Sequence, residues 1–178
     1  MSVPGARRAE IVATARDLLE QEGEAALTMR SIASRLGIRA PSLYKHFPDK
    51  EAIEVELMAT GFAELGDALE MSVAGSSQPV ADVAAAYRHW ALEHPHLYRL
   101  LTNRPLPRGR LPAGVEARAA RPLLDAVGGS LAAARAVWGL AHGLVSLQLS
   151  DRFPPGADID AAWEVGIAMV TTSRPVIS

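Results

Sequence analysis

Residues 28–50 read TMRSIASRLGIRAPSLYKHFPDK, and this stretch decides the fold. The side-chain oxygen of Thr28 can accept a hydrogen bond from the free amides of a starting helix. Apolar residues then recur at helical spacing from Met29 to Leu36, which predicts a helix of about two turns. Gly37 follows where a left-handed C-cap residue belongs, so we expect the chain to turn sharply there.

The second half of the stretch has the features of a short polar helix. Pro41 suits the first turn of a helix because its missing N–H would have no partner there. Leu43 and Phe47 form an i, i+4 apolar pair on one side of this helix. Pro48 cannot continue it, and Asp49 is a good N-cap for the next helix. The stretch therefore predicts a helix-turn-helix.

The charge of this stretch is locally basic. Residues 28–50 contain five Lys or Arg residues against one acid, whereas residues 51–75 contain six acids and no base. The whole chain has a formal net charge of -2 at pH 7, so the segment and not the average favours a nucleic-acid partner. The alternative is that these charges lie on ordinary solvated helix faces.

The motifs T-x-R-x-I-A from Thr28, L-G-I at the turn and A-P-S-L-Y-K-H-F-P-D-K-E from Ala40 resemble the DNA-binding domain of the TetR family of transcriptional repressors. The similarity covers residues 6–68 and implies double-stranded operator DNA as the partner. The DNA-contacting residues implied by the resemblance are Thr28, Arg30, Arg39, Ala40, Pro41, Ser42, Tyr44, Lys45, His46 and Lys50.

The resemblance also implies contact roles that agree with side-chain chemistry. Arg30 and Lys45 can donate to guanine O6 and N7, and the Ala40-Pro41 pair can pack on a thymine methyl group. Arg39 stands at a position where a Ser or Thr N-cap would be common. It weakens the cap but adds a cation at the groove edge. Phosphate contacts are implied for Thr28, Ser42, Tyr44, His46 and Lys50.

Composition limits the remaining possibilities. A chain of 178 residues with 49% hydrophobic residues is long enough for one or two domains with a buried core. The absence of cysteine excludes disulfides and thiolate sites. No apolar run reaches the length of a membrane span, and no signal-peptide core follows residues 1–5, so we expect a cytoplasmic protein without a membrane partner. Sixteen arginines against two lysines indicate a bacterial genome of high G+C content.

Helical periodicity in the rest of the chain predicts an all-α fold. A first helix over residues 6–22 is expected to pack across the motif, and a long connector is expected from 49 to 71. A loop rich in Gly, Ser and Pro over 73–79 separates two predicted domains. These are a DNA-binding domain, 6–68, and a helical domain for effector binding and dimerisation, 79–178.

Two further groups of arginines have alternative interpretations. Arg7 and Arg8 could contact phosphates that flank the site or belong to a solvated terminus. Residues 103–114 contain three prolines and two glycines and predict a mobile loop. A second nucleic-acid contact by the three arginines of this loop is the alternative, although no aromatic or helical framework accompanies them.

A second resemblance lies in the C-terminal half. Trp138 followed by His142-Gly143, together with H-P-x-L-Y from His94 to Tyr98, is similar to the TetR subgroup whose C-terminal domain is named for its Trp and His-Gly residues (WHG). This resemblance implies an all-helical effector domain that also dimerises.

Two helices, expected over residues 130–152 and 158–173, are apolar on more than one side. Pairs of these helices from two protomers would form a four-helix homodimer interface; the alternative is that they form the interior of one domain. The small residues that would let facing backbones approach are Gly139, Gly143, Ser146, Ala162 and Gly166.

Aromatic and histidine residues concentrate in residues 80–150, which contain two of three Trp, two of three Tyr and four of five His. Large apolar walls with a few polar groups are typical of small-molecule sites. We therefore predict a cavity for a small apolar or amphipathic effector, with a solid core as the equal alternative. The predicted walls are Tyr87, Trp90, His94, Tyr98, Trp138 and His142.

The sequence gives little support for catalysis or metal binding. His94 and His96 flank a proline and lack the H-x-x-x-H spacing of a helical metal site. His-Glu-x-x-His, Gly-x-Ser-x-Gly and phosphate-binding glycine loops are absent from the sequence. We expect no catalytic residue, metal or cofactor. The predicted function is a ligand-released repressor of a palindromic operator, with a constitutive DNA-binding module as the alternative.

Overall fold

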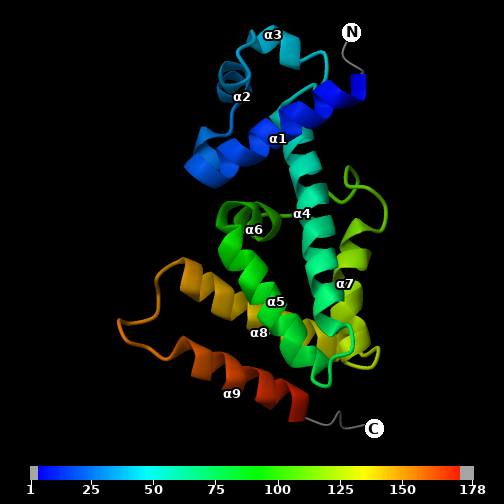
Figure 1. Cartoon of the computed structure of the whole chain (residues 1–178), viewed down its shortest axis with the longest axis vertical. Helices are drawn as coiled ribbons and strands as arrows, with labels where there is room; N and C mark the ends of the chain where they lie inside the picture. Colours follow the sequence, from blue (N-terminus) through cyan, green and yellow to red (C-terminus); the bar gives the residue numbers. More distant parts are fainter. Residues whose placement is uncertain (1–3, 173–178) are drawn as a thin grey trace. The chain divides into compact units, whose positions relative to one another are not determined.

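The computed structural model describes residues 4–172, and helices dominate this part of the chain (Figure 1). The predicted all-α fold is confirmed. Contacts divide the described chain into two compact units. Unit 1 comprises residues 4–62 and His94–Val115, and unit 2 comprises Ala63–Glu93 and residues 116–172. Residues 173–178, the end of the predicted C-terminal domain, lie outside the described residues.

Unit 1 opens with the predicted helix-turn-helix. Its first elements are α1 (Pro4–Glu22), a 3-10 helix (Glu24–Ala26), α2 (Met29–Arg35) and α3 (Ala40–Leu43). Thr28 caps α2, because its Oγ1 accepts a hydrogen bond from the Ser31 N–H at 3.0 Å. Gly37 has a φ of 66°, and the Ile38 N–H donates to the Ala33 carbonyl at 3.0 Å. The turn chemistry expected from the sequence is therefore present.

The second helix of the motif is shorter than predicted. α3 ends at Leu43, and the Leu43 carbonyl accepts from the N–H groups of His46 at 2.8 Å and Phe47 at 2.9 Å, which closes a turn. Arg39 at the N-cap provides no side-chain hydrogen bond. Pro48 cannot donate a backbone hydrogen bond. A weak cap on one side and a proline on the other leave about one helical turn between them.

The connector predicted after the motif is one long helix, α4 (Lys50–Val73). Asp49 starts it, since its Oδ1 accepts from the Ala52 N–H at 2.7 Å. The helix contributes residues to unit 1 as far as Phe62 and to unit 2 from Ala63 onward.

Unit 1 also includes a later helix, α6 (Pro95–Thr102), which packs on α1. The Glu20 carboxylate of α1 accepts from the N–H groups of His96 at 3.3 Å and Leu97 at 3.0 Å, so a distant side chain satisfies the start of α6. A Cβ atom added at Gly61 would lie 2.8 Å from Leu97 Cδ2. The glycine therefore permits the close approach of α4 and α6.

The apolar residues expected on the inner faces of unit 1 are buried. Phe47 is fully buried, and the Arg8 guanidinium lies 4.0 Å from its ring centroid. Other fully buried side chains of this unit are Ile11, Leu19, Leu27, Ile32, Leu43, Ile53, Leu97 and Leu100.

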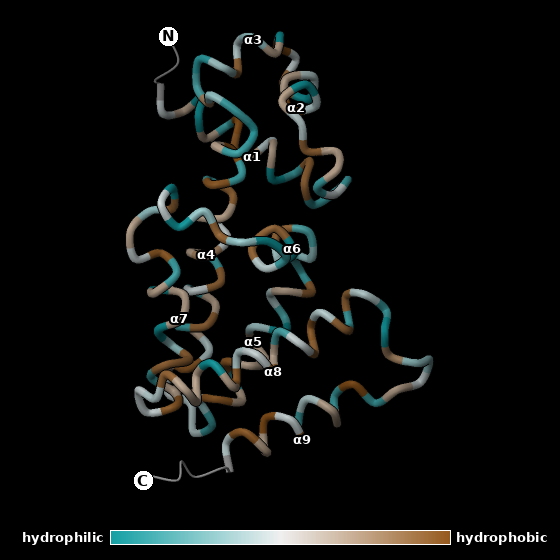
Figure 2. The backbone as a smooth tube through the Cα atoms, turned by 180° about the vertical axis from the view of Figure 1, so that it is seen from behind, coloured by the Kyte–Doolittle hydropathy of each residue, from teal (hydrophilic) through white to brown (hydrophobic). Residues whose placement is uncertain are grey.

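Unit 2 is a helical assembly in which hydrophobic residues recur along α5, α8 and α9 (Figure 2). Besides the end of α4, its helices are α5 (Pro79–Glu93), α7 (Val115–Ala126), α8 (Leu131–Leu149) and α9 (Ile159–Thr172). α5 packs on α8 and α9, and α8 packs on α9. The core includes Val83, Tyr87 and Trp90 of α5 and Val137 and Val145 of α8.

Within the described residues, no single helix is both long and apolar enough to cross a membrane. α7 and α8 would be long and apolar enough only if they formed one continuous helix, but the chain bends by 104° between them.

We expect Phe47→Ala to lower the free energy of unfolding by about 3 to 5 kcal/mol, because it removes a fully buried ring and leaves a cavity. Urea denaturation measures the change. Met71→Ala is the matched control, since Met71 is 78% exposed and its truncation should change stability by less than about 0.5 kcal/mol. Equal denaturation midpoints for the two variants would show that Phe47 does not anchor the motif.

Candidate nucleic-acid interface

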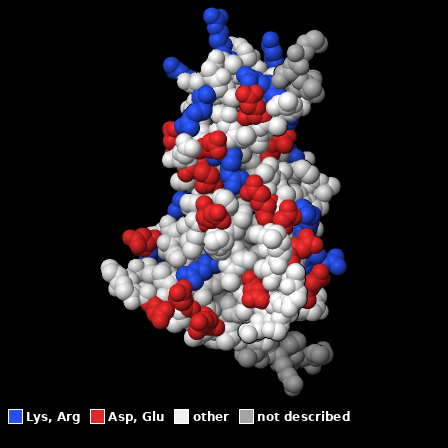
Figure 3. Space-filling model, viewed as in Figure 1, with Lys and Arg blue, Asp and Glu red and all other residues white. Residues whose placement is uncertain are grey.

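The candidate interface is the outer side of α2, α3 and the turns that flank them. Lys and Arg side chains project from this end of unit 1 (Figure 3). Arg30, Arg39 and Lys45 are exposed, and they form no ion pair with any other side chain among residues 4–172. No carboxylate among the described residues therefore compensates these three positive charges.

Nine of the ten predicted DNA-contacting residues lie on this segment, and the tenth, Lys50, is the first residue of α4; they differ in exposure. Those exposed to solvent are Thr28, Arg30, Arg39, Pro41, Tyr44 and Lys45, and those half-buried are Ala40, Ser42, His46 and Lys50. Tyr44 is 54% exposed, so its ring contributes little to the core of unit 1. Their contacts with DNA stay a prediction.

Two arginines near this surface are already occupied. Arg35 of α2 pairs with Glu22 and donates to Gln21 Oε1 at 2.9 Å. Arg7 pairs with Glu10 at 2.6 Å. The Arg35 contacts join α2 to α1, and the Arg7 pair lies within α1, so the cations without an ion pair are those on α2 and beside α3.

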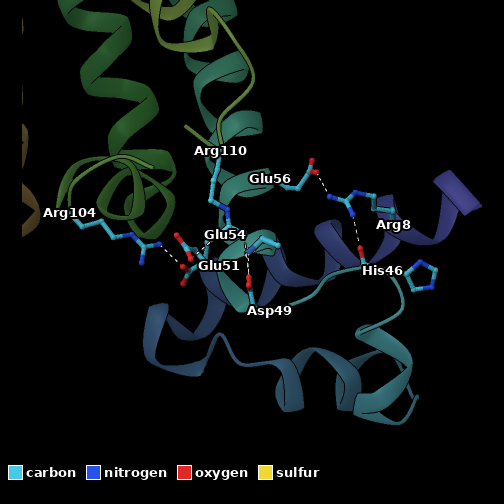
Figure 4. A network of polar contacts seen from close by, with 9 residues as sticks. Arg8, His46, Asp49, Glu51, Glu54, Glu56, Arg104 and Arg110 are labelled. Carbon is cyan, nitrogen blue, oxygen red and sulfur yellow. Dashed lines mark hydrogen bonds and ion pairs between the residues drawn. The ribbon is translucent and has the colours of Figure 1, made fainter. Parts of the chain in front are cut away.

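Arg8 has an internal role that sequence analysis did not assign. Its Nη1 donates to the His46 carbonyl at 2.7 Å, and its Nη2 donates to Glu56 Oε1 at 2.5 Å (Figure 4). Its guanidinium also covers the Phe47 ring. Arg8 therefore connects α1 to the turn after α3 and to α4. These partners are 38 and 48 residues away in the sequence, and no local sequence pattern predicts a contact over such a separation.

A second network missed by sequence analysis lies at the start of α4. Arg104 and Arg110 from the loop after α6 face carboxylates there, including the buried Glu54 (Figure 4). Glu54 is also 3.0 Å from the Lys50 Nζ, an i, i+4 pair that the sequence could have revealed. The arginines are too distant in sequence to be recognised in this way.

The six residues predicted to bound a ligand cavity are divided between the two units. Tyr87 and Trp90 are buried in α5, and the Trp138 and His142 rings of α8 have centroids 6.0 Å apart. Trp138 is 51% exposed. The other two belong to unit 1, where His94 is the half-buried N-cap of α6 and Tyr98 is buried. A cavity formed by all six stays a prediction.

Unit 2 contains a groove of about 950 Å³ lined by residues of α5 and α9. Its walls include Ala84, Arg88, Trp163 and Ile167, and the six predicted cavity residues are not among them. The Arg88 guanidinium lies 5.3 Å from the Trp163 ring centroid and pairs with Asp160 at 2.5 Å. The walls are mainly apolar and also carry Arg88, Asp82 and Glu164, a combination that suits an amphipathic molecule.

The predicted small-residue interface divides into two parts. Apart from its chain neighbours and the adjacent backbone of α8, a Cβ atom added at Gly139 or Gly143 would meet no atom of the described chain within 4 Å. At Gly166 of α9 it would lie 3.0 Å from Leu140 Cδ2, so this glycine serves the packing of α8 on α9 in one protomer. Ser146 and Ala162 are half-buried.

Large apolar side chains are exposed on the same two helices. They are Leu131 at 58%, Trp138 at 51%, Leu147 at 44%, Val165 at 59% and Met169 at 66%. Clusters of exposed apolar residues on a folded chain mark interaction surfaces.

Among residues 4–172, no group of three or more His, Asp or Glu side chains could hold a metal ion.

The fold and the basic helix-turn-helix define a DNA-binding regulator, and comparisons with known families agree. Residues 11–57 match the family of bacterial regulatory proteins, tetR family, and residues 80–170 match a tetracyclin repressor-like C-terminal domain. The chain belongs to the TetR family of transcriptional regulators. The family resemblance noted in the sequence is confirmed; the finer resemblance to the WHG subgroup is not confirmed by these matches.

Similar proteins support this assignment. The HTH-type transcriptional regulator Rv1816 of Mycobacterium tuberculosis is 30% identical over 133 residues, which are 70% of this chain and 57% of that protein. The chain thus spans little more than half of that relative. The HTH-type transcriptional regulator Rv0681 of the same organism is 30% identical over 154 residues, or 80% of this chain and 70% of that protein.

Solved structures show the same fold. The regulatory protein SCO4313 has a TM-score of 0.77 and 27% identity, covering 94% of this chain and 96% of that one. A TetR variant from Acinetobacter baumannii AYE in complex with minocycline has a TM-score of 0.65 and 24% identity, covering 90% and 92%.

Burial lowers the pKa of the His142 imidazole below its ordinary value of 6.5. The unfolded chain then binds the proton more tightly than the folded chain, so the free energy of unfolding should fall as the pH decreases through about 6.5. We expect His142→Gln to weaken this pH dependence in urea denaturation. His89→Gln is the control, because the His89 side chain is 82% exposed, and it should leave the pH dependence in place. Identical pH profiles for wild type and His142→Gln would contradict the assignment.

Proposed function

We propose that the protein is a homodimeric repressor that binds a palindromic operator through α3 and its flanks, and that a small molecule releases it. The observation that carries this proposal is the pattern of charge around α3. Arg39 and Lys45 flank α3 and Arg30 lies on α2, and none of them has an internal ion-pair partner among the described residues, while Leu43 of α3 is fully buried. A short helix that is held by a buried apolar residue and has unpaired cations at both ends suits insertion into a major groove.

The proposed contact roles follow from side-chain chemistry and exposure. Arg30 and Lys45 would read guanine edges, and Ala40-Pro41 would pack on a thymine methyl group. Arg39 would place its charge at the groove edge. Phosphate contacts are assigned to Thr28, Ser42, Tyr44, His46 and Lys50.

The proposed dimer uses the exposed apolar face of α8 and α9. Gly139 and Gly143 face open space in the protomer, and Trp138 and Leu147 of the same helix are exposed beside them. A second copy of the chain would bury these apolar side chains and would place two α3 helices on one DNA duplex. Ser146 and Ala162 stay proposed members of this interface, whereas the position of Gly166 favours a role within the protomer.

The proposed effector is a small apolar or amphipathic molecule bound in the C-terminal part of the chain, residues 79–178, with DNA binding assigned to 6–68. The α5–α9 groove supports space for such a molecule, and the minocycline complex of a structural neighbour supports this kind of regulation. A constitutive DNA-binding module is the alternative, and the response of DNA binding to small molecules separates the two. A DNA partner also implies a cytoplasmic location and requires no catalytic residue.

The DNA contacts can be tested with two variants that differ in contact type. Lys50→Ala should weaken binding to all sequences similarly and make the slope of log affinity against log salt shallower by about 0.9. Arg30→Ala should cost about 1 to 3 kcal/mol on the operator and relax one base position. Fluorescence anisotropy with operator and random duplexes measures both effects. Equal losses on the two duplexes for both variants would show that Arg30 does not read a base.

The dimer proposal predicts different effects for two glycines. Gly143→Leu places a side chain in open space of the protomer, so it should leave the fold intact but loosen the dimer, at the cost of about 1 to 3 kcal/mol typical of overpacking. Gly166→Leu should instead destabilise the protomer, because its side chain would collide with Leu140. Sedimentation and urea denaturation together separate the outcomes. An unchanged dimer for Gly143→Leu would place the interface elsewhere.

A further inference from the structure

The loop after α6, residues 103–114, is folded into unit 1 by its own turns. The N–H groups of Arg110 and Leu111 both donate to the Pro107 carbonyl, at 2.8 and 3.2 Å, and the Leu111 side chain is buried. These contacts give the loop a defined conformation. Two of its arginines, Arg104 and Arg110, face carboxylates of unit 1.

Arg104 faces the buried carboxylate of Glu54, which also lies close to Lys50, a proposed DNA contact. Its Nη2 lies 2.9 Å from Glu54 Oε2, and its Nη1 lies 3.4 Å from Glu24 Oε1. Glu54 is only 4% exposed, and its other oxygen lies 3.0 Å from the Lys50 Nζ. Within the described chain, Glu54 Oε1 and Arg104 Nη2 lack a well-aligned hydrogen bond, so charge attraction dominates these contacts. Glu54 thus stands between two cations, one from the loop and one from the DNA side.

Arg110 compensates two further carboxylates at the start of α4. Its Nη1 lies 2.5 Å from Glu51 Oε2, and its Nη2 lies 3.5 Å from Asp49 Oδ1. Asp49 is also the N-cap of α4. Without the loop, the first turns of this helix would present three carboxylates beside Lys50, close to the proposed path of the DNA phosphates. Negative charge there would repel DNA, most strongly at low salt.

We propose that Arg104 and Arg110 are positioning residues for DNA binding, which act by neutralising the carboxylates around Lys50. The inference rests on the proposed phosphate contact of Lys50. Arg104 supplies the positive charge that the buried Glu54 requires, so the Lys50 ammonium can leave Glu54 for a phosphate. When Arg104 is absent, Lys50 is the remaining close partner of Glu54, and removing it from a buried carboxylate is costly.

Direct contact of these arginines with DNA would require them to leave their carboxylates. The Arg104 side chain is 33% exposed and has two acidic partners, and the Arg110 side chain is 39% exposed and also has two. This arrangement contrasts with Arg30, Arg39 and Lys45, whose charges have no internal partner among residues 4–172. The loop arginines therefore act on the DNA through Lys50 and its neighbours.

The test measures the salt dependence of binding for charge-neutralising variants, with a labelled duplex that carries an operator obtained by selection from a random DNA pool. Arg104→Gln should weaken binding about tenfold and make the log–log salt slope shallower by about 0.9, as if one phosphate contact were lost. Adding Glu54→Gln should restore both values, because the neutral amide that replaces the carboxylate no longer holds Lys50. In a Lys50→Gln background, Arg104→Gln should cause a much smaller further loss, because only the repulsion by Glu54 remains and no phosphate contact of Lys50 is left to lose.

Three results would overturn the inference. If the Arg104→Gln, Glu54→Gln double variant bound as weakly as Arg104→Gln, Arg104 would contact DNA itself. If affinity fell without a change in salt slope, Arg104 would support only the fold, which urea denaturation would report independently. If Lys50→Gln left the slope unchanged, the phosphate contact of Lys50 would be wrong, while the Arg30→Ala test would still report on operator recognition.

Arg118→Gln is the matched control for the loss of one arginine charge, and Arg110→Gln tests the second loop arginine. Arg118 pairs with Asp67 at 2.5 Å in unit 2, and both side chains are more than half exposed. Arg118→Gln should leave affinity and salt slope unchanged, which shows that the loss of one arginine charge is not sufficient. Arg110→Gln should weaken binding by about threefold, less than Arg104→Gln, because its partners Glu51 and Asp49 are exposed and screened.

Discussion

Burial of the Phe47 ring beneath the Arg8 guanidinium is the contact on which the DNA-binding unit depends. α3 spans one turn and has no side-chain cap, so it cannot be stable by itself. Phe47 anchors the turn that follows α3 in the core, and Arg8 joins that turn to α1 and α4 through a carbonyl and a carboxylate. Neighbouring elements therefore hold α3 and the turn after it in place, while Arg39, Tyr44 and Lys45 stay exposed to solvent.

The arginines of unit 1 differ in whether the folded chain supplies a partner for their charge. Arg8, Arg35, Arg104 and Arg110 each face a carboxylate inside unit 1, whereas Arg30, Arg39 and Lys45 have no ion-pair partner among the described residues. The same contrast holds for apolar residues in unit 2, where α5 is buried but parts of α8 and α9 are exposed. Groups that the folded chain leaves unsatisfied identify the surfaces at which DNA and a second protomer are proposed to bind.

Local chemistry explains what could be predicted from the sequence. The caps at Thr28 and Asp49 and the turn at Gly37 depend on residues at most a few positions apart, so their signals lie within one helix or turn. Contacts between distant segments were missed, such as Arg8 with Glu56 and Arg104 with Glu54, because periodicity carries no information on which helices meet. For the same reason the packing of α6 on α1 within unit 1 was not foreseen. The α5–α9 groove was missed because its walls are mainly small apolar residues that have no distinctive pattern.

Selection of bound DNA from a random pool tests whether α3 of each protomer in a dimer reads one half of an operator. We expect to recover a palindrome whose half-sites are separated by about one helical turn, or about 10 base pairs, or a multiple of it. Variants of Arg30 should shift the preferred base at one symmetric pair of positions in that palindrome. Recovery of sequences without a repeated half-site, or no enrichment over the starting pool, would contradict a dimeric, sequence-reading repressor.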